Sequence, residues 1–154
     1  MADPMFSALC RSFPMILVTG GLGVMGATLV KGLVARGLPV RVLDNSDQFL
    51  SRLDGIEAEV RIGDITKPET LAGCFDGVDT VYHLAAILVA RDPALYEKIN
   101  VGGTRNMIDA ATAAGVKHFI LVSSASVTYA HTTPYSLSKR ETERLIREQK
   151  AMKW

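Results

Sequence analysis

A tyrosine and a lysine four positions apart suggest proton-transfer chemistry near the end of the chain. Tyr135 and Lys139 would lie on the same face of a helix, because residues i and i+4 are neighbours on a helix surface. A phenol ordinarily loses its proton at about pH 10, but a nearby ammonium stabilises the phenolate. Such a tyrosine can exchange a proton with a substrate hydroxyl near neutral pH. The alternative is an ordinary exposed helix pair, which contributes little.

Serine hydroxyls shortly before this pair could hold the other reactant. Ser124 follows an apolar stretch and precedes Tyr135 by eleven positions, so one short loop can bring both side chains to the same carbonyl. We expect Ser124 to hold the substrate oxygen while Tyr135 transfers the proton. Ser126 is the alternative for this role, and hydrogen bonding to the backbone at a strand end is the structural alternative for Ser124.

A glycine-rich turn near the N-terminus indicates a phosphate-binding site. Two patterns overlap in it, Gly21-x-Gly23-x-x-Gly26 and Gly20-x-x-Gly23-x-x-Gly26. Glycines allow a tight strand-to-helix turn and the close approach of a pyrophosphate to the backbone, and the helix N-terminus then faces the phosphates. A flexible turn is the alternative. The residues predicted to contact a cofactor here are Gly20, Leu22, Gly23, Val24, Met25 and Gly26.

An acidic residue follows the turn at a suitable distance for ribose recognition. Asp44 lies 18 positions after Gly26, at the end of a second apolar segment, where a carboxylate can accept hydrogen bonds from the adenosine ribose. The 2′-phosphate of NADP would meet like charge there, and no arginine directly follows. The sequence therefore favours NAD over NADP, although an ordinary acidic turn residue remains the alternative for Asp44.

Alternating apolar runs and helical patterns place these groups in an α/β fold. We expect strands at 15–19, 39–44, 58–62, 79–84 and 118–123, and helices at 23–36, from 67, at 92–114 and at 134–150. This alternation predicts a doubly wound parallel sheet of the Rossmann type, in the order 3-2-1-4-5. In such sheets ligands bind at the carboxyl ends of the strands, near the point where the strand order reverses.

Composition limits the other possibilities. A length of 154 residues fits one domain, which we place at 14–154 after a loose leader at 1–13. The net charge of +1 gives no reason to expect nucleic acid or a membrane as a partner, and no signal peptide or membrane span is predicted. Cys10 and Cys74 suggest neither a disulfide framework nor a metal site, so we expect a cytoplasmic protein without a metal.

Six motifs occur in an order typical of one family. The chain resembles the extended short-chain dehydrogenases/reductases, in particular the NAD-dependent epimerase/dehydratase group and its hydroxysteroid-dehydrogenase-like relatives. The resemblance covers about 15–150. Its motifs are Thr19–Gly26, Asp64-Ile65, His83–Ala86, Asn100–Thr104, Ser123-Ser124 and Tyr135-x-x-x-Lys139.

The resemblance implies further site residues. Asp64 and Ile65 would contact adenine, and Ala85 and Ala86 would let the cofactor pass the end of the fourth strand. Asn100 would orient the helix or a water near the site, and Lys139 would also bind the nicotinamide ribose. His83 would be a packed strand residue and His131 a surface residue.

The resemblance also implies an NAD-dependent oxidoreductase module that transfers a hydride to or from a secondary alcohol or ketone. The substrate is a small molecule, for which a nucleotide sugar is one candidate, and the family's helix contact suggests a homodimer. Because the family continues with later strands and a C-terminal substrate domain, we expect this chain to lack them and to be weakly active or inactive alone. The alternatives are a non-catalytic NAD-binding sensor or scaffold, and a hydroxysteroid- or flavonol-type reductase fragment.

Overall fold

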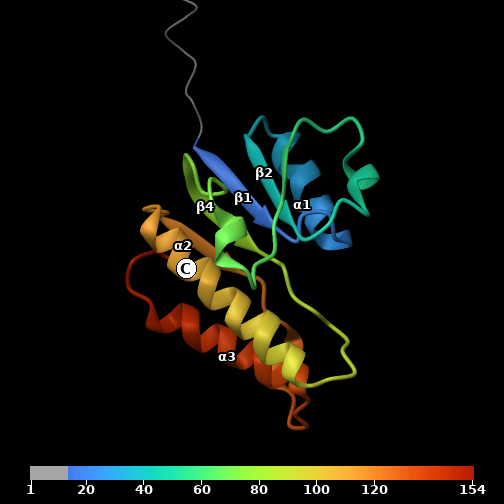
Figure 1. Ribbon diagram of the computed structural model, residues 1–154, viewed down its shortest axis with the longest axis vertical. Coiled ribbons are helices and arrows are strands. Elements are labelled where there is room, and N and C mark those ends of the chain that lie inside the picture. The colour runs from blue at the N-terminus through green and yellow to red at the C-terminus, as the bar shows by residue number, and fades with distance from the viewer. Residues whose placement is uncertain (1–13) are drawn as a thin grey trace, which may run out of the picture.

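Five short strands form one parallel sheet in the computed structural model, which describes residues 14–154 (Figure 1). Their order is β3-β2-β1-β4-β5, which confirms the predicted topology. The expected leader at 1–13, with Cys10, lies outside the described residues. The strands are β1 (Met15–Thr19), β2 (Val40–Asp44), β3 (Glu59–Ile62), β4 (Val78–His83) and β5 (His118–Leu121).

The sheet is buried on both faces near its centre. In β1, the adjacent residues Leu17 and Val18 are both fully buried, although their side chains point to opposite faces. A strand covered on both sides needs apolar residues at consecutive positions, and this explains the continuous apolar sequence of β1. β1 pairs with β2 on one side and with β4 on the other. The strand order therefore reverses beside β1, and the carboxyl ends of β1 and β4 diverge into different connections.

Helices cover the two faces of the sheet (Figure 1). On one face, α1 (Val24–Val34) packs through Val30 against β1 and β2. On the other, α2 (Gly103–Ala113) and α3 (Pro134–Glu148) lie side by side and share a core with β4 and β5 around Phe119. This arrangement leaves the carboxyl edge of the sheet open for a ligand.

The helix predicted at 92–114 has a different form. A π-helix, η3 (Tyr96–Gly102), leads directly into α2. A wider π turn changes which side chains share a face, and such turns are frequent at functional sites. The apolar period alone could not distinguish this turn from an α-helix. The part of the chain that the structure describes also has three short 3-10 helices: η1 (Leu50–Leu53), η2 (Pro68–Leu71) and η4 (Ala125–Thr128).

The last residues of the chain lie beside β5. Lys153 forms a parallel bridge with His118: the Lys153 amide donates to Lys117 O and the Phe119 amide donates to Lys153 O, each at 2.9 Å. Met152 is buried in the same core as Phe119. These contacts align the last residues of the chain with β5. Among residues 14–154, no helix is long and apolar enough to cross a membrane.

Candidate functional site

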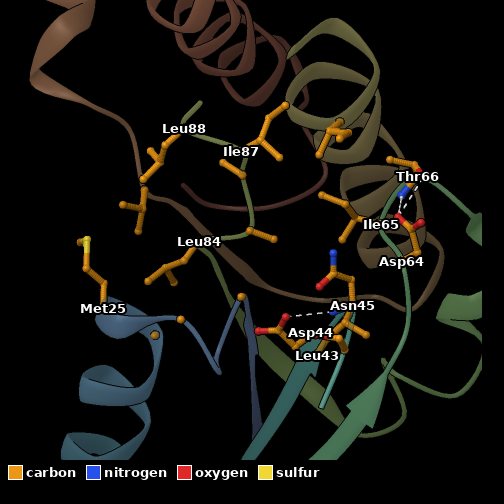
Figure 2. A pocket seen from close by; sticks show the side chains of 18 of the residues that line it. Met25, Leu43, Asp44, Asn45, Asp64, Ile65, Thr66, Leu84, Ile87 and Leu88 are labelled. Carbon is orange, nitrogen blue, oxygen red and sulfur yellow. Dashed lines mark hydrogen bonds between the residues drawn. The ribbon is translucent and has the colours of Figure 1, made fainter. Parts of the chain in front are cut away.

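A cleft of about 680 Å³ opens at the carboxyl edge of the sheet, where β1, β2 and β4 end. Figure 2 shows that Asp44 and Asp64 lie on one side of it, with Met25, Leu84 and Leu88 on another. The volume is in the range of about 300–1,000 Å³ found for ligand sites. The predicted residues that line it are Gly20, Gly23, Val24, Met25, Gly26, Asp44, Asp64, Ile65, Ala85, Ala86, Tyr135 and Lys139.

The glycine turn is packed so closely that a Cβ would lie less than 3.0 Å from a neighbouring atom at Gly20, Gly21 and Gly26. Gly20 has a φ of 68°, and a Cβ there would lie 2.9 Å from the Ala85 nitrogen. At Gly26 a Cβ would lie 2.1 Å from Gly20 O, so α1 can begin directly beneath the turn only with glycine at this position. The positive φ at Gly20 identifies it as the turn glycine and favours the pattern that starts at Gly20.

The N-terminus of α1 faces the cleft without a side-chain cap. Its N-cap is Gly23, which has no side chain to occupy the first-turn amides. The amides of Val24, Met25 and Gly26 belong to this turn, where N–H groups have no acceptor within the helix. Together with the positive end of the helix dipole, they form an anion site that fits the pyrophosphate of a dinucleotide.

Asp44 is held against the glycine turn. Its Oδ2 accepts a hydrogen bond from the Leu22 amide and its Oδ1 accepts one from the Asn45 amide, each at 2.9 Å. Arg52 donates to Leu22 O at 2.7 Å and stacks on the Phe49 ring, with 4.0 Å from Cζ to the ring centroid. Leu22 therefore contributes its backbone to the turn, while its side chain is buried in the core beneath it. The preformed carboxylate leaves lone pairs for ribose hydroxyls.

On the side expected to take adenine, Asp64 accepts hydrogen bonds from the Thr66 amide at 2.9 Å and from its hydroxyl at 2.8 Å. Partial burial opposes ionisation, but these hydrogen bonds outweigh it and lower the pKa of Asp64. The Ile65 carbonyl is fixed by the Asn106 amide group at 2.9 Å. Ile65 also packs closely on Gly103: a Cβ at Gly103 would lie 2.5 Å from Ile65 Cδ1.

A buried chain of hydrogen bonds supports the mouth of the cleft. His83 Nδ1 is 2.7 Å from the Thr19 hydroxyl and its Nε2 is 3.0 Å from the Thr104 hydroxyl. The Ala85 amide donates to the Thr19 hydroxyl at 3.2 Å, which holds the segment after β4 against the end of β1. Burial, helped by the charge of Lys139, lowers the pKa of His83 to about 3. His83 is thus a neutral packed residue, as expected.

Tyr135 and Lys139 meet the other end of the cleft from the first turns of α3. A capping box fixes this helix end: the Thr133 hydroxyl accepts from the Ser136 amide, and the Ser136 hydroxyl accepts from the Thr133 amide. The ammonium of Lys139 donates to Val122 O at 2.6 Å, which ties α3 to the end of β5. Burial lowers the pKa of Lys139, and the charge of Glu143 opposes this effect.

The serines after β5 differ in whether they line the cleft. Ser123 lines the cleft and donates to Glu143 Oε1 at 2.6 Å. Ser124 does not line it; its hydroxyl is 2.9 Å from that of Ser126 and also accepts from the Ser126 amide. The predicted substrate contact, Ser124, and its alternative, Ser126, are therefore hydrogen-bonded to each other beside the cleft.

Asn100 lies behind the cleft wall. It is almost fully buried, and its amide group bonds to both the N–H and the C=O of Ile87 as well as to the Ser138 hydroxyl. It braces the segment after β4 and the start of α3 instead of lining the cleft. Among residues 14–154, no group of His, Cys, Asp or Glu side chains could hold a metal ion.

Several lining residues were not predicted from the sequence. Arg52 and Phe49 come from η1 and the turn before it, which follow β2 without an apolar period, and Lys98 comes from the π-helix. The basic residue at position 52 was a possible signal, because an arginine within ten residues of Asp44 can reach the same ribose site. Ser123 and Ser124 are adjacent, so their side chains point in different directions. Which of them faces the cleft depends on where the strand ends, and the sequence does not show this.

Comparison with protein families identifies a matching family model. Residues 17–152 match the 3-beta hydroxysteroid dehydrogenase/isomerase family. A 3 beta-hydroxysteroid dehydrogenase/Delta 5→4-isomerase of Mycobacterium tuberculosis is 39% identical over 129 residues, which are 79% of this chain and 34% of the relative. The human sterol-4-alpha-carboxylate 3-dehydrogenase, decarboxylating, is 35% identical over 113 residues, 73% of this chain and 29% of the relative. The chain thus spans about a third of the length of these curated relatives.

Solved structures with the same fold include a short-chain dehydrogenase/reductase superfamily protein from Agrobacterium tumefaciens with bound NAD. Its TM-score is 0.76 at 32% identity, over 90% of this chain and 46% of that one. The UDP-glucose 4-epimerase of Thermotoga maritima, solved with UDP-glucose, gives a TM-score of 0.77 at 27% identity, over 86% of this chain and 50% of that one. These matches confirm the resemblance and the fold class inferred from the sequence.

Proposed function

Because the chain belongs to the 3-beta hydroxysteroid dehydrogenase/isomerase family, we propose that it is the dinucleotide-binding and proton-transfer part of an NAD-dependent dehydrogenase. One observation carries the proposal. A single cleft joins the glycine turn and Asp44 at one end to Tyr135 and Lys139 at the other, so a cofactor bound by the turn and a proton donor would meet the same substrate.

Each residue then has a distinct task. The first-turn amides of α1 bind the pyrophosphate, and Asp44 accepts hydrogen bonds from the adenosine ribose. A bound NAD would supply the hydride acceptor for the carbinol carbon, and NADH would supply the hydride donor for the reverse direction. The Tyr135 oxygen accepts the proton of the substrate hydroxyl as the carbonyl forms. Lys139 stabilises the phenolate and holds the nicotinamide ribose. Ser124 would orient the substrate oxygen once its hydroxyl leaves that of Ser126 and turns into the cleft.

A 3β-hydroxysteroid-like alcohol is the substrate class that we favour over a nucleotide sugar. The segment after β4 presents apolar side chains to the cleft at Leu84, Ile87 and Leu88, and an apolar wall suits a sterol better than a sugar. The names of the curated relatives support this choice, whereas the similar UDP-glucose 4-epimerase keeps the nucleotide sugar as the competing candidate.

Calorimetric titration with NADH and NADPH tests the cofactor site. We expect NADH to bind more tightly, because the 2′-phosphate of NADPH would face the Asp44 carboxylate, while the Arg52 guanidinium is already bound to Leu22 O and stacked on the Phe49 ring. Replacement of Asp44 by Asn should narrow the difference between the two. A chain that binds neither dinucleotide would remove the basis of the proposal, and a preference for NADPH would contradict the role of Asp44.

Turnover tests the chemistry. With NAD and a 3β-hydroxysteroid, we expect slow NADH formation that Tyr135→Phe abolishes while NADH affinity is retained, because only the transferable proton is removed. UDP-glucose serves as the comparison substrate, and turnover of UDP-glucose alone would contradict the steroid assignment. In a chain extended to the full length of its relatives, tight NADH binding without turnover of either alcohol, unaffected by Tyr135→Phe, would instead favour a non-catalytic binding protein.

A further inference from the structure

The segment that follows β4 forms a wall of the cleft although it belongs to no helix or strand. Figure 2 shows Leu84, Ile87 and Leu88 along it, above the end of the sheet. The next residue, Val89, is 90% exposed, so burial holds the segment only in part. Backbone groups of such a segment have no strand partner and need other hydrogen-bond partners. The position of this wall therefore depends on whatever side chains bind its backbone.

Two side chains of the π-helix η3 bind that backbone. The Tyr96 hydroxyl accepts a hydrogen bond from the Ala90 amide at 2.9 Å and donates to Leu88 O at 3.3 Å. One turn later, Asn100 accepts from the Ile87 amide at 2.8 Å and donates to Ile87 O at 3.2 Å. Together they hold the segment 87–90 at two points.

Tyr96 also contacts the residue expected to transfer the proton. Its ring meets the ring of Tyr135 edge to face, with centroids 6.2 Å apart and an interplanar angle of 62°. This is a favourable geometry for aromatic pairs. Tyr96 is only 8% exposed, so its ring has little freedom to move away. One side chain thus touches both the cleft wall and Tyr135.

We propose that Tyr96 is a positioning residue that couples the wall 87–90 to the ring of Tyr135. Its hydroxyl sets the place of the wall against which the nicotinamide end of the cofactor lies, and its ring limits the orientations of the Tyr135 phenol. The hydrogen-bonding part of this role stands on the contacts alone, whereas its consequence for the cofactor rests on the proposed function.

Two substitutions separate the hydroxyl from the ring. Tyr96→Phe removes both hydrogen bonds to the wall and keeps the ring contact with Tyr135. Tyr96→Leu removes the hydrogen bonds and the ring contact together. Tyr129→Phe is the matched control, because Tyr129 is 57% exposed. Amide hydrogen exchange reports on the wall at Ala90, and the ring resonances of Tyr135 in tyrosine-labelled protein report on the phenol.

In Tyr96→Phe we expect exchange at the Ala90 amide to accelerate about tenfold, the upper end for loss of one neutral hydrogen bond. The Ile87 amide, which Asn100 holds, should stay protected, and the Tyr135 resonances should stay in place. Tyr96→Leu should shift those resonances as well. Unchanged exchange at Ala90 in Tyr96→Phe would overturn the wall contact, and unchanged Tyr135 resonances in Tyr96→Leu would overturn the coupling.

A ligand measurement tests the functional consequence. Tyr96→Phe should weaken NADH binding several-fold and leave the affinity for ADP-ribose unchanged, because ADP-ribose lacks the nicotinamide that would lie against the wall. Equal losses for both ligands would show a general structural effect and contradict the positioning role. If the parent chain binds no NADH, the proposed function fails, while exchange and resonances still decide the coupling.

Discussion

The glycines of α1 differ in the space that surrounds them, and this difference separates a functional glycine from an incidental one. Gly26 lies beneath the turn, where a Cβ would be 2.1 Å from Gly20 O. Gly32 lies two turns later, where a Cβ would meet only the end of the Arg36 side chain, at 3.4 Å. The same substitution should therefore have opposite effects at the two positions.

Gly26→Ala should destabilise the chain by about 1–3 kcal/mol, the usual cost of overpacking, and should weaken NADH binding because the turn must open. Gly32→Ala is the control and should stabilise by about 0.5–1 kcal/mol, since alanine is the better helix residue. Urea denaturation and NADH titration measure both effects. Equal stability of the two variants would contradict the packing of the glycine turn.

The buried His83 predicts a pH dependence of stability. Its pKa falls from 6.5 to about 3 on folding because of burial. Below pH 6.5 the unfolded chain therefore binds a proton that the folded chain does not. This difference in proton binding does not lower the free energy of unfolding above pH 6.5. As the pH falls from 6.5 toward 3, the free energy of unfolding decreases with a slope that approaches about 1.4 kcal/mol per pH unit.

Urea denaturation between pH 7 and pH 5 checks this slope, in a range where carboxylates contribute little. His83→Gln should flatten it, whatever its effect on stability at pH 7. His131→Gln is the control and should leave the slope unchanged, because His131 is exposed. A parent chain with no loss of stability between pH 6.5 and pH 5 would argue against a neutral buried His83.

Residue types in the sequence predicted the two ends of the cleft but not every contact in it. Tyr135 and Lys139 could be placed together because helical spacing fixes neighbours. Whether Ser123 or Ser124 faces the cleft depends on where β5 stops, and it stops at Leu121, two residues before the predicted end. Beyond that point the hydrogen bonds of Lys139 and Glu143 arrange the chain, and these are tertiary contacts.

Among the elements, α3 depends on the cap at its first turn. Thr133 and Ser136 exchange hydrogen bonds around Pro134, and the helix begins there, as predicted. The cap sets the direction of the first turn, which carries Tyr135. The π-helix η3, by contrast, could not be anticipated, because its wider turn is stabilised by side chains such as Asn100 that bind segments distant in the sequence.

Thr133→Ala should therefore destabilise the chain by about 0.5–2 kcal/mol, the usual cost of losing an N-cap hydroxyl. Thr132→Ala provides the control, since Thr132 is exposed and lies outside the capping box. Thermal or urea denaturation compares the two variants. Similar stability in both would mean that the box contributes nothing to α3.

For the whole molecule, the sheet order and the two helical layers followed from the alternation of apolar runs, because parallel strands and right-handed crossovers leave few arrangements. The end of the chain adds a contact that periodicity could not supply. Met152 is 6% exposed and packs in the core with Phe119 and Ile146. The last residues thus contribute to the stability of the sheet from outside its five strands.

Met152→Ala should cost about 2–5 kcal/mol, as for other large-to-small core substitutions. Met25→Ala is the matched control, because Met25 is 67% exposed and should change stability little. The free energy of unfolding in urea measures both. Equal effects of the two substitutions would show that the chain end does not pack as described.

The buried link of Thr19, His83 and Thr104 has an evolutionary consequence. Each member satisfies a polar atom of another. Replacing one by an apolar residue therefore leaves a buried polar side chain without a partner, whereas replacing all three leaves only the Ala85 amide, which donates to the Thr19 hydroxyl, without one. A single replacement at one of these positions should be destabilising, so the three residues should change together in evolution. Pairwise thermodynamic cycles would register that dependence as large non-additivity.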